Sequence, residues 1–122
     1  MIYSNKIKSN INCLFLLKGK ETMNYINELG KELKNLGITD GDVILMHPSL
    51  KSLGVKEISP EIVISALLNV IGEGGTLILP CLSYAEVTDK KPIFSVTSTP
   101  CCVGAIPEYF RTRKKTIRSV HP

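Results

Sequence analysis

The chain has 122 residues, of which 43% are hydrophobic and 21% are charged, and its formal net charge is +4. This length allows one domain at most, and the hydrophobic fraction is too high for a disordered chain. The charge is unevenly distributed, because residues 1–20 and 111–122 hold no acidic residue, whereas residues 21–110 hold all eleven acids and six lysines. The sequence therefore predicts one small globular domain with two basic ends.

Residues 1–22 show no clear hydrophobic period, and we interpret them as an extension that is expected to lack regular structure. A helix is predicted next, because apolar residues recur at steps of three, four and three, and Gly37 follows them as a typical helix end. These apolar residues are Ile26, Leu29, Leu33 and Leu36. The domain itself is accordingly placed at residues 23–122.

A strand, a helix and a second strand are predicted in the middle of the chain. The continuous apolar run 43–46 is typical of a strand that is buried on both faces. Ser59 suits the N-cap of a helix that has Pro60 in its first position and ends at Gly72. The run 76–79 predicts a second doubly buried strand. This succession indicates two parallel strands joined by a right-handed crossover.

The C-terminal part of the sequence predicts a loop, a helix and a third strand. Residues 81–100 have no regular period and are expected to form a long loop. Residues 103–113 have a helical pattern, although Pro107 is expected to break or restart the helix. Residues 117–120 read as a strand. The predicted fold class is therefore α/β, with a parallel sheet.

Both histidines follow predicted strands, at the carboxyl ends where open parallel sheets bind their ligands. His47 is either a general base or ligand donor, or a buried structural imidazole, and the pattern alone favours the structural role. Ser49 and Ser52 either bind phosphate or serve ordinary turn chemistry. Cys81 also follows a strand, and we interpret it as a structural thiol. His121, after the last strand, has no assigned role on pattern alone.

Cysteine usage and hydropathy argue against a metal site and a membrane partner. The cysteines form no C-x-x-C pair and only two histidines are present, so no zinc site is predicted. Their irregular spacing is not typical of a secreted disulfide framework, and reduced, buried thiols are expected. The apolar stretch 11–17 lacks a cleavage site and is far too short to span a bilayer. A cytoplasmic protein is therefore expected.

A basic C-terminal patch is the remaining feature, and its members are Arg111, Arg113, Lys114, Lys115 and Arg118. The patch either contacts phosphates or forms a solvated helix end, where cations also suit the helix dipole. Aromatic residues do not interleave with these charges, so nucleic acid is not an expected partner. One functional alternative is a small, non-catalytic α/β binding module that uses this patch.

Three ordered segments resemble a known family. GDVILMHPSLKSLG (41–54), ALLNVIGEGGTLILP (66–80) and TSTPCCVGAIPEYFRTRKKTIRSVHP (97–122) resemble the aminoglycoside 3-N-acetyltransferase family, over about residues 24–122. The resemblance implies a partial three-layer α/β sandwich with mostly parallel strands. It also implies transfer of an acetyl group from acetyl-coenzyme A, the cosubstrate, to the 3-amino group of a 2-deoxystreptamine aminoglycoside, without a metal.

The same resemblance implies the site residues. His121 is the catalytic candidate, because it matches the first histidine of a His-Pro-Thr-His-Ser element in the family. The residues that match the coenzyme A pocket are His47, Ser49, Leu50, Ser52, Thr99, Val103 and Gly104. Pro48 departs from the Ser or Ala that is common in the family, and so removes a backbone N–H.

The second histidine of that element, which the resemblance implies to be the likelier general base, is absent from the sequence. We therefore expect the chain to be the N-terminal portion of an acetyltransferase and to be inactive alone. Residues 1–22 have no counterpart in the family pattern. An apolar sheet edge left uncovered is expected to favour self-association.

Overall fold

A computed structural model of the chain describes residues 2–5 and 18–120. In this part of the chain, a four-stranded sheet has the order β2-β3-β1-β4. The strands are β1 (Ile2–Asn5), β2 (Val43–Leu45), β3 (Thr76–Leu79) and β4 (Ile117–Arg118). β2 and β3 are parallel, whereas β1 runs antiparallel to both β3 and β4. Three of these four strands therefore point the same way, as the predicted fold class requires.

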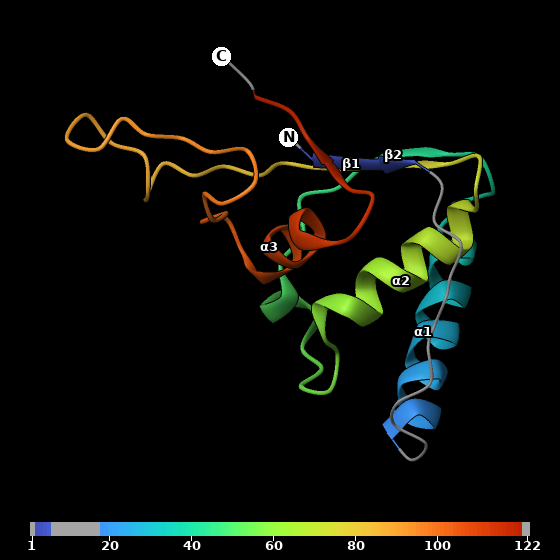
Figure 1. Cartoon of the computed structure of the whole chain (residues 1–122). Coiled ribbons are helices and arrows are strands. Elements are labelled where there is room, and N and C mark those ends of the chain that lie inside the picture. The colour runs from blue at the N-terminus through green and yellow to red at the C-terminus, as the bar shows by residue number, and fades with distance from the viewer. Residues whose placement is uncertain (1, 6–17, 121–122) are drawn as a thin grey trace.

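The helices of the described residues lie on one side of the sheet (Figure 1). They are α1 (Lys18–Asn35), α2 (Pro60–Ile71) and α3 (Ala105–Thr112). The main core lies between α2, α3 and β3, and its fully buried side chains are Ile64, Ile71, Leu77, Leu79, Ile106 and Phe110. The described part of the chain thus has two layers, helices and sheet, and the opposite face of the sheet carries no helix.

The helix that joins the parallel strands is built as its sequence predicts. The Ser59 hydroxyl accepts a hydrogen bond from the Ile62 N–H at 3.3 Å, and Pro60 occupies the first helical position. The helix ends at Gly72, whose φ is 64°. Ser59, Pro60 and Gly72 are therefore confirmed as the boundary residues of the crossover helix.

The first strand of that crossover differs from its prediction. β2 was expected to be buried on both faces, but Val43 is 70% exposed and Leu45 is 55% exposed. Ile44 alone in this strand packs toward the core. The reason is topological, because β2 is an edge strand of the described sheet and its outer face has no covering layer there. Leu36, at 80% exposure, likewise falls outside the apolar face of α1 that was predicted to include it.

Pro107 does not break the third helix, contrary to expectation. α3 begins at Ala105, so Pro107 lies in the first turn, where backbone N–H groups have no partner within the helix. The Glu108 N–H already donates to the Gly104 carbonyl at 3.2 Å. The prolyl ring therefore costs the helix no hydrogen bond, and the helical segment continues to Thr112.

The N-terminal segment also differs from its expectation. Ile2–Asn5 form β1 in the middle of the sheet, and α1 begins at Lys18 rather than near residue 22. Extended residues without a hydrophobic period can join a sheet through backbone hydrogen bonds alone, and pattern analysis does not detect such a strand. The rest of the predicted extension, residues 6–17, lies outside the described residues.

Candidate functional site

The carboxyl ends of the parallel strands define the candidate site. β2 and β3 are neighbours, with Leu45 paired to Ile78, and the Met46 N–H donates to the Ile78 carbonyl at 2.9 Å. The chain segments that leave these two strands therefore start side by side. β4 points the same way but is separated from β3 by β1. His121, the catalytic candidate, lies just beyond the described residues.

The segment after β2 presents polar groups to solvent. His47 is exposed, so the buried structural imidazole that the pattern favoured is wrong. Ser49 and Ser52 are also exposed, and the Ser52 hydroxyl donates to that of Ser49 at 2.9 Å. Leu50 begins a short 3-10 helix, Leu50–Leu53, and its side chain packs against the core. Gly54, with φ of 69°, closes this turn. The segment is thus anchored by one apolar side chain and open to a ligand.

The second predicted stretch is more enclosed. Thr99 is buried, with 9% exposure, and its hydroxyl accepts a hydrogen bond from the Ser95 N–H at 2.8 Å. Val103 is half-buried, and Gly104 is exposed at the N-terminus of α3. Val103 and Leu50 pack against the same hydrophobic cluster, which brings the two predicted stretches to one core. The hydroxyl and the carbonyl of Thr99 both accept hydrogen bonds within the protein, so this residue stabilises loop 81–100.

Arg118 has a structural role that the sequence did not reveal. It belongs to the predicted basic patch but is only 8% exposed. One terminal nitrogen, Nη1, donates to the Thr99 carbonyl at 2.6 Å and to the Val96 carbonyl at 3.3 Å. The other, Nη2, donates to the Ser83 hydroxyl at 2.7 Å and to the Cys81 carbonyl at 3.3 Å. Arg118 therefore holds both ends of loop 81–100 against β4.

A half-buried cation of the patch, Arg111, is paired. Arg111 forms a two-pronged hydrogen bond with the Glu108 carboxylate, whose Oε2 also accepts from the Cys101 N–H at 2.7 Å. The Arg111 guanidinium also donates to the Thr97 carbonyl at 2.7 Å. The hydrogen bond from Arg111 holds the pKa of Glu108 below its usual value. Glu and Arg at i and i+3 of a helix are a recognisable signal for such a pair.

The arginines at 111 and 118 thus serve internal contacts and are not free to form a phosphate-binding surface. Arg113 lies over the Tyr109 ring, 5.8 Å from its centroid. The non-catalytic module that is the functional alternative would use the whole patch, and two of its five members, Arg111 and Arg118, are engaged within the protein. The geometry therefore favours the site at the strand ends.

Cys81 follows β3 and is buried, with 6% exposure. Burial raises the pKa of the Cys81 thiol to about 11, and the neighbouring Cys101 thiol adds to the effect. A thiol with a raised pKa is a poor nucleophile near neutral pH. The structural role predicted for Cys81 is consistent with this environment, and Cys81, Cys101 and Cys102 are all free thiols.

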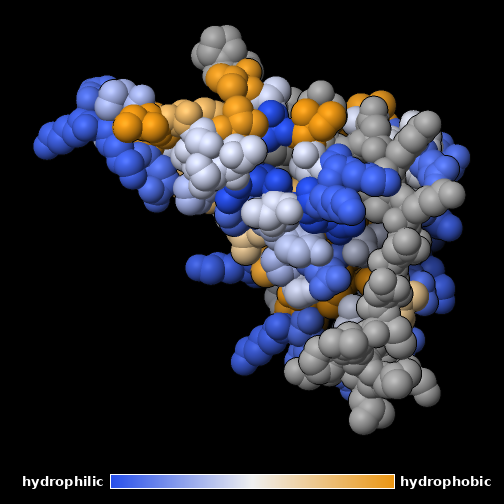
Figure 2. All heavy atoms as spheres, viewed as in Figure 1, coloured by the Kyte–Doolittle hydropathy of each residue, from blue (hydrophilic) through white to orange (hydrophobic). Residues whose placement is uncertain are grey.

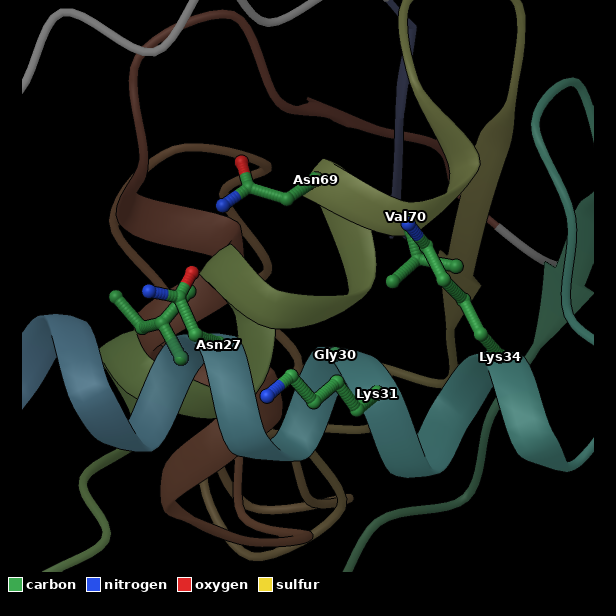
Figure 3. Close-up of a pocket in the computed structure, with 7 residues that line it drawn as sticks. Asn27, Gly30, Lys31, Lys34, Asn69 and Val70 are labelled. Atoms are coloured by element: carbon green, nitrogen blue, oxygen red, sulfur yellow. The ribbon is translucent and has the colours of Figure 1, made fainter.

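A cavity of about 350 Å³ lies elsewhere, between α1 and α2 (Figure 3). Its lining residues are Ile26, Asn27, Gly30, Lys31, Lys34, Asn69 and Val70. No residue predicted to bind coenzyme A lines this cavity. Within residues 2–5 and 18–120, no cluster of ionisable side chains is arranged to hold a metal ion, and no helix is long and apolar enough to cross a bilayer.

The sequence profile of the family described as aminoglycoside 3-N-acetyltransferase matches residues 45–122. Aminoglycoside N(3)-acetyltransferase VII of Streptomyces paromomycinus is 30% identical over 89% of this chain and 44% of its own length. Aminoglycoside N(3)-acetyltransferase IV of a Salmonella species is 38% identical over 78% of this chain and 36% of its own length. The chain belongs to the aminoglycoside 3-N-acetyltransferase family.

A solved structure supports the same fold. The crystal structure of aminoglycoside acetyltransferase AAC(3)-IVa in complex with apramycin superposes with a TM-score of 0.69 and 35% identity. It covers 79% of this chain but only 39% of the AAC(3)-IVa chain. The chain thus spans less than half of the relatives that it matches.

Proposed function

We propose that this chain supplies the coenzyme A-binding part of an aminoglycoside N3-acetyltransferase. The observation that supports the proposal is segment 47–52 at the carboxyl end of β2, where His47, Ser49 and Ser52 are exposed, within the part of the chain that matches the family. The relatives are named for this reaction, and a solved relative holds apramycin. Aminoglycosides are therefore the proposed acceptor class.

Acetyl transfer to an amine sets three requirements. The amine must lose its proton, because an ammonium has no lone pair with which to attack the thioester. Hydrogen-bond donors must stabilise the oxygen of the thioester carbonyl as it becomes negative. The pantetheine arm and phosphates must be held so that the two substrates react as one bound pair. We assign the binding requirement to the segment after β2 and the catalytic requirement to the segment after β4, which contains His121.

The segment after β2 fits the binding task. The hydroxyls of Ser49 and Ser52 and the imidazole of His47 are exposed and available to phosphate or amide groups of the cosubstrate. Val103 and Gly104 would border the same ligand, since Val103 shares its hydrophobic cluster with Leu50. Thr99 would contribute indirectly, by fixing the loop. Pro48 has no N–H to offer, so the serine hydroxyls carry more of the binding.

His121 is proposed as a catalytic residue, because it matches the first histidine of the family element. It follows β4, which shares its direction with β2 and β3. The proposal also includes residence in the cytoplasm, where free thiols such as Cys81 and Cys101 remain reduced.

Calorimetry with coenzyme A tests the binding part of the proposal. We expect weak binding, in the millimolar range, by the 122-residue chain. Replacing both Ser49 and Ser52 by Ala should weaken it about threefold to tenfold, the effect of losing one or two neutral hydrogen bonds. Thr39→Ala is the matched control, because Thr39 is an exposed hydroxyl residue before β2, at the opposite end of that strand. A folded chain that gives no heat with millimolar coenzyme A would contradict the proposal.

An acetylation assay tests the expected inactivity of the chain alone. No acetyl transfer from acetyl-coenzyme A to gentamicin or kanamycin should be detectable, because one histidine of the family element is absent from the sequence. Product detected by mass spectrometry in proportion to the amount of chain would show that expectation to be wrong.

A further inference from the structure

Two buried thiols lie at the base of loop 81–100, and the proposed function gives neither a binding or catalytic role. Cys81 begins the loop and is 6% exposed, and Cys101 follows its last residue and is 9% exposed. Of the residues in this loop, only Cys81 and Thr99 are buried. The rest of the loop projects away from the helices (Figure 1), and its outer end carries hydrophilic side chains in Figure 2. The position of the loop therefore depends on contacts at its base.

A backbone hydrogen bond aligns the two ends of the loop. The Cys102 N–H donates to the Leu82 carbonyl at 2.8 Å, so the two ends run side by side. Cys81 and Cys101 each precede one of these residues, and both belong to the main hydrophobic cluster. Leu82, by contrast, is 49% exposed. The alignment therefore directs one cysteine from each end of the loop into the same part of the core.

The thiols of Cys81 and Cys101 are direct neighbours. Burial raises the pKa of the Cys81 thiol, and the Cys101 thiol adds to this as a nearby charge and as a hydrogen-bond partner. The backbone of each cysteine is held separately. The Cys101 N–H donates to Oε2 of Glu108 at 2.7 Å, and the Cys81 carbonyl accepts from Nη2 of Arg118 at 3.3 Å. Two thiols that meet on fixed backbone segments have the arrangement from which a disulfide forms.

Cys102 provides a contrast within the same segment. It is adjacent to Cys101 in the sequence, but it is half-buried and its thiol donates to the Leu82 carbonyl at 3.3 Å. Its thiol is therefore engaged with backbone and does not belong to the buried cluster that holds the other two. An oxidant should accordingly distinguish between these adjacent cysteines.

We propose that Cys81 and Cys101 form a modification site, a buried dithiol that a small organic disulfide oxidises to an internal disulfide closing the base of loop 81–100. The free thiols in the structure are its reduced state. A disulfide at this place would close a ring of about 20 residues and stabilise the protein by restricting the unfolded chain. The proposal uses no property of acetyl transfer.

Oxidised glutathione can serve as the oxidant. The Cys101 thiol loses its proton, and its sulfur attacks one sulfur of oxidised glutathione, so that the S–S bond of the oxidant breaks and one glutathione leaves. The Cys81 thiol then loses its proton, and its sulfur attacks the Cys101 sulfur and displaces the second glutathione. Two protein thiols are thereby oxidised to one disulfide, and one oxidised glutathione is reduced to two thiols, which take up both protons.

The burial of the pair sets the conditions for this reaction. Thiolate is the attacking species, and burial with a raised pKa leaves little of it on Cys81. We therefore expect closure to take hours. In a reducing compartment the pair stays as thiols, and an excess of oxidant is needed to close it.

Oxidation of the folded chain tests the proposal. All samples carry Cys13→Ser, because Cys13 lies outside the described residues. Incubation with excess oxidised glutathione should lower the intact mass by two hydrogen atoms, without retained glutathione. Thermal unfolding should then show a Tm higher by about 5–15 °C, and dithiothreitol should reverse the change.

Cys102→Ser is the matched control for Cys101→Ser, since the two positions are adjacent. Cys102→Ser should form the disulfide as the parent does, whereas Cys101→Ser and Cys81→Ser should each form at least tenfold less of it. Circular dichroism verifies that each variant folds. A disulfide that forms equally well in Cys101→Ser overturns the proposal. Its formation in urea but not in the folded chain also overturns it.

Hydrogen exchange provides a second measurement that does not rely on the serine variants at 81, 101 and 102. The Cys102 amide, which bonds to Leu82 at the base of the loop, should exchange at least about tenfold more slowly after oxidation. An unchanged rate in the oxidised chain would show that the disulfide does not hold the loop, and would overturn the proposal. Calorimetry with coenzyme A is a separate test, so failure of the proposed function leaves this result unaffected.

Discussion

The guanidinium of Arg118 lies 4.8 Å from the centroid of the Phe94 ring, at the base of loop 81–100. A cation above an aromatic face is attracted by the ring quadrupole, more strongly when water is excluded. Among the described residues, no carboxylate forms an ion pair with Arg118, and carbonyl groups and this ring surround its charge instead. The buried Nε has no hydrogen-bond partner there. The side chain of Arg118 therefore joins loop 81–100 to β4.

Replacing Arg118 by Lys should release the loop. An ammonium cannot reproduce the planar fork that reaches Thr99 and Ser83 at once, so we expect the free energy of unfolding to fall by about 2–4 kcal/mol. Urea denaturation measures this change. Arg113→Lys is the control, with an expected change below about 1 kcal/mol, because Arg113 contacts the Tyr109 ring near the surface. If the two substitutions lowered the free energy of unfolding equally, Arg118 would have no special role in holding the loop.

Gly75→Ala should destabilise the protein strongly. A Cβ at Gly75 would lie 2.5 Å from the Ile71 carbonyl oxygen and 2.6 Å from the Ile71 Cβ, so backbone would have to move. The expected loss is about 2–4 kcal/mol, measured by thermal or urea unfolding. Gly74→Ala is the matched control, since its Cβ would meet the Gly41 Cα at an ordinary 3.7 Å. A Gly75→Ala variant as stable as Gly74→Ala would show that the turn adapts.

Glu108 should make stability depend on acidic pH. The hydrogen bond from Arg111 lowers the pKa of Glu108 in the folded state. Its stabilising effect is therefore complete above the ordinary glutamate pKa and is lost as pH falls through the lowered value. Melting temperatures of the unaltered chain and Glu108→Gln should differ at pH 7 and converge toward pH 3. A constant difference across this range would contradict the assignment, and Glu28→Gln, on the exposed side of α1, controls for general charge effects.

Cys81 should resist alkylation in the native protein. With a pKa of about 11, only about one thiol in a thousand is ionised at pH 8, and burial restricts access further. Iodoacetamide labelling followed by peptide mass spectrometry should be at least about a hundredfold slower for native Cys81 than for Cys81 in urea. Half-buried Cys102 provides an internal comparison. Rapid native labelling of Cys81 would indicate a reactive thiol instead.

Local signals in the sequence predicted most of the helices and the pair of parallel strands, β2 and β3. Ser59, Pro60 and Gly72 act through neighbouring backbone groups, so their roles can be read without knowledge of the fold. The position of His47 after a strand was predicted for the same reason, although its exposure was not.

Features that depend on distant parts of the chain could not be predicted. Arg118 looks like one member of a basic run, and its burial depends on carbonyl groups of a loop that has no pattern of its own. The exposure of Val43 and Leu45 depends on what covers the sheet, which an apolar run does not reveal. Thr99 and Ser49 are similar residue types, yet tertiary context makes one internal and the other accessible.

The position of β1 has a consequence for how the chain acquires its structure. β4 joins the described sheet only through β1, so the strand that leads to His121 depends on the first few residues of the chain. Both partners of β1 are distant in sequence, and contacts of this kind form late because loop-closure entropy opposes them. The pairing of β1 with β4 should therefore form late in folding, after β3 is in place beside β1.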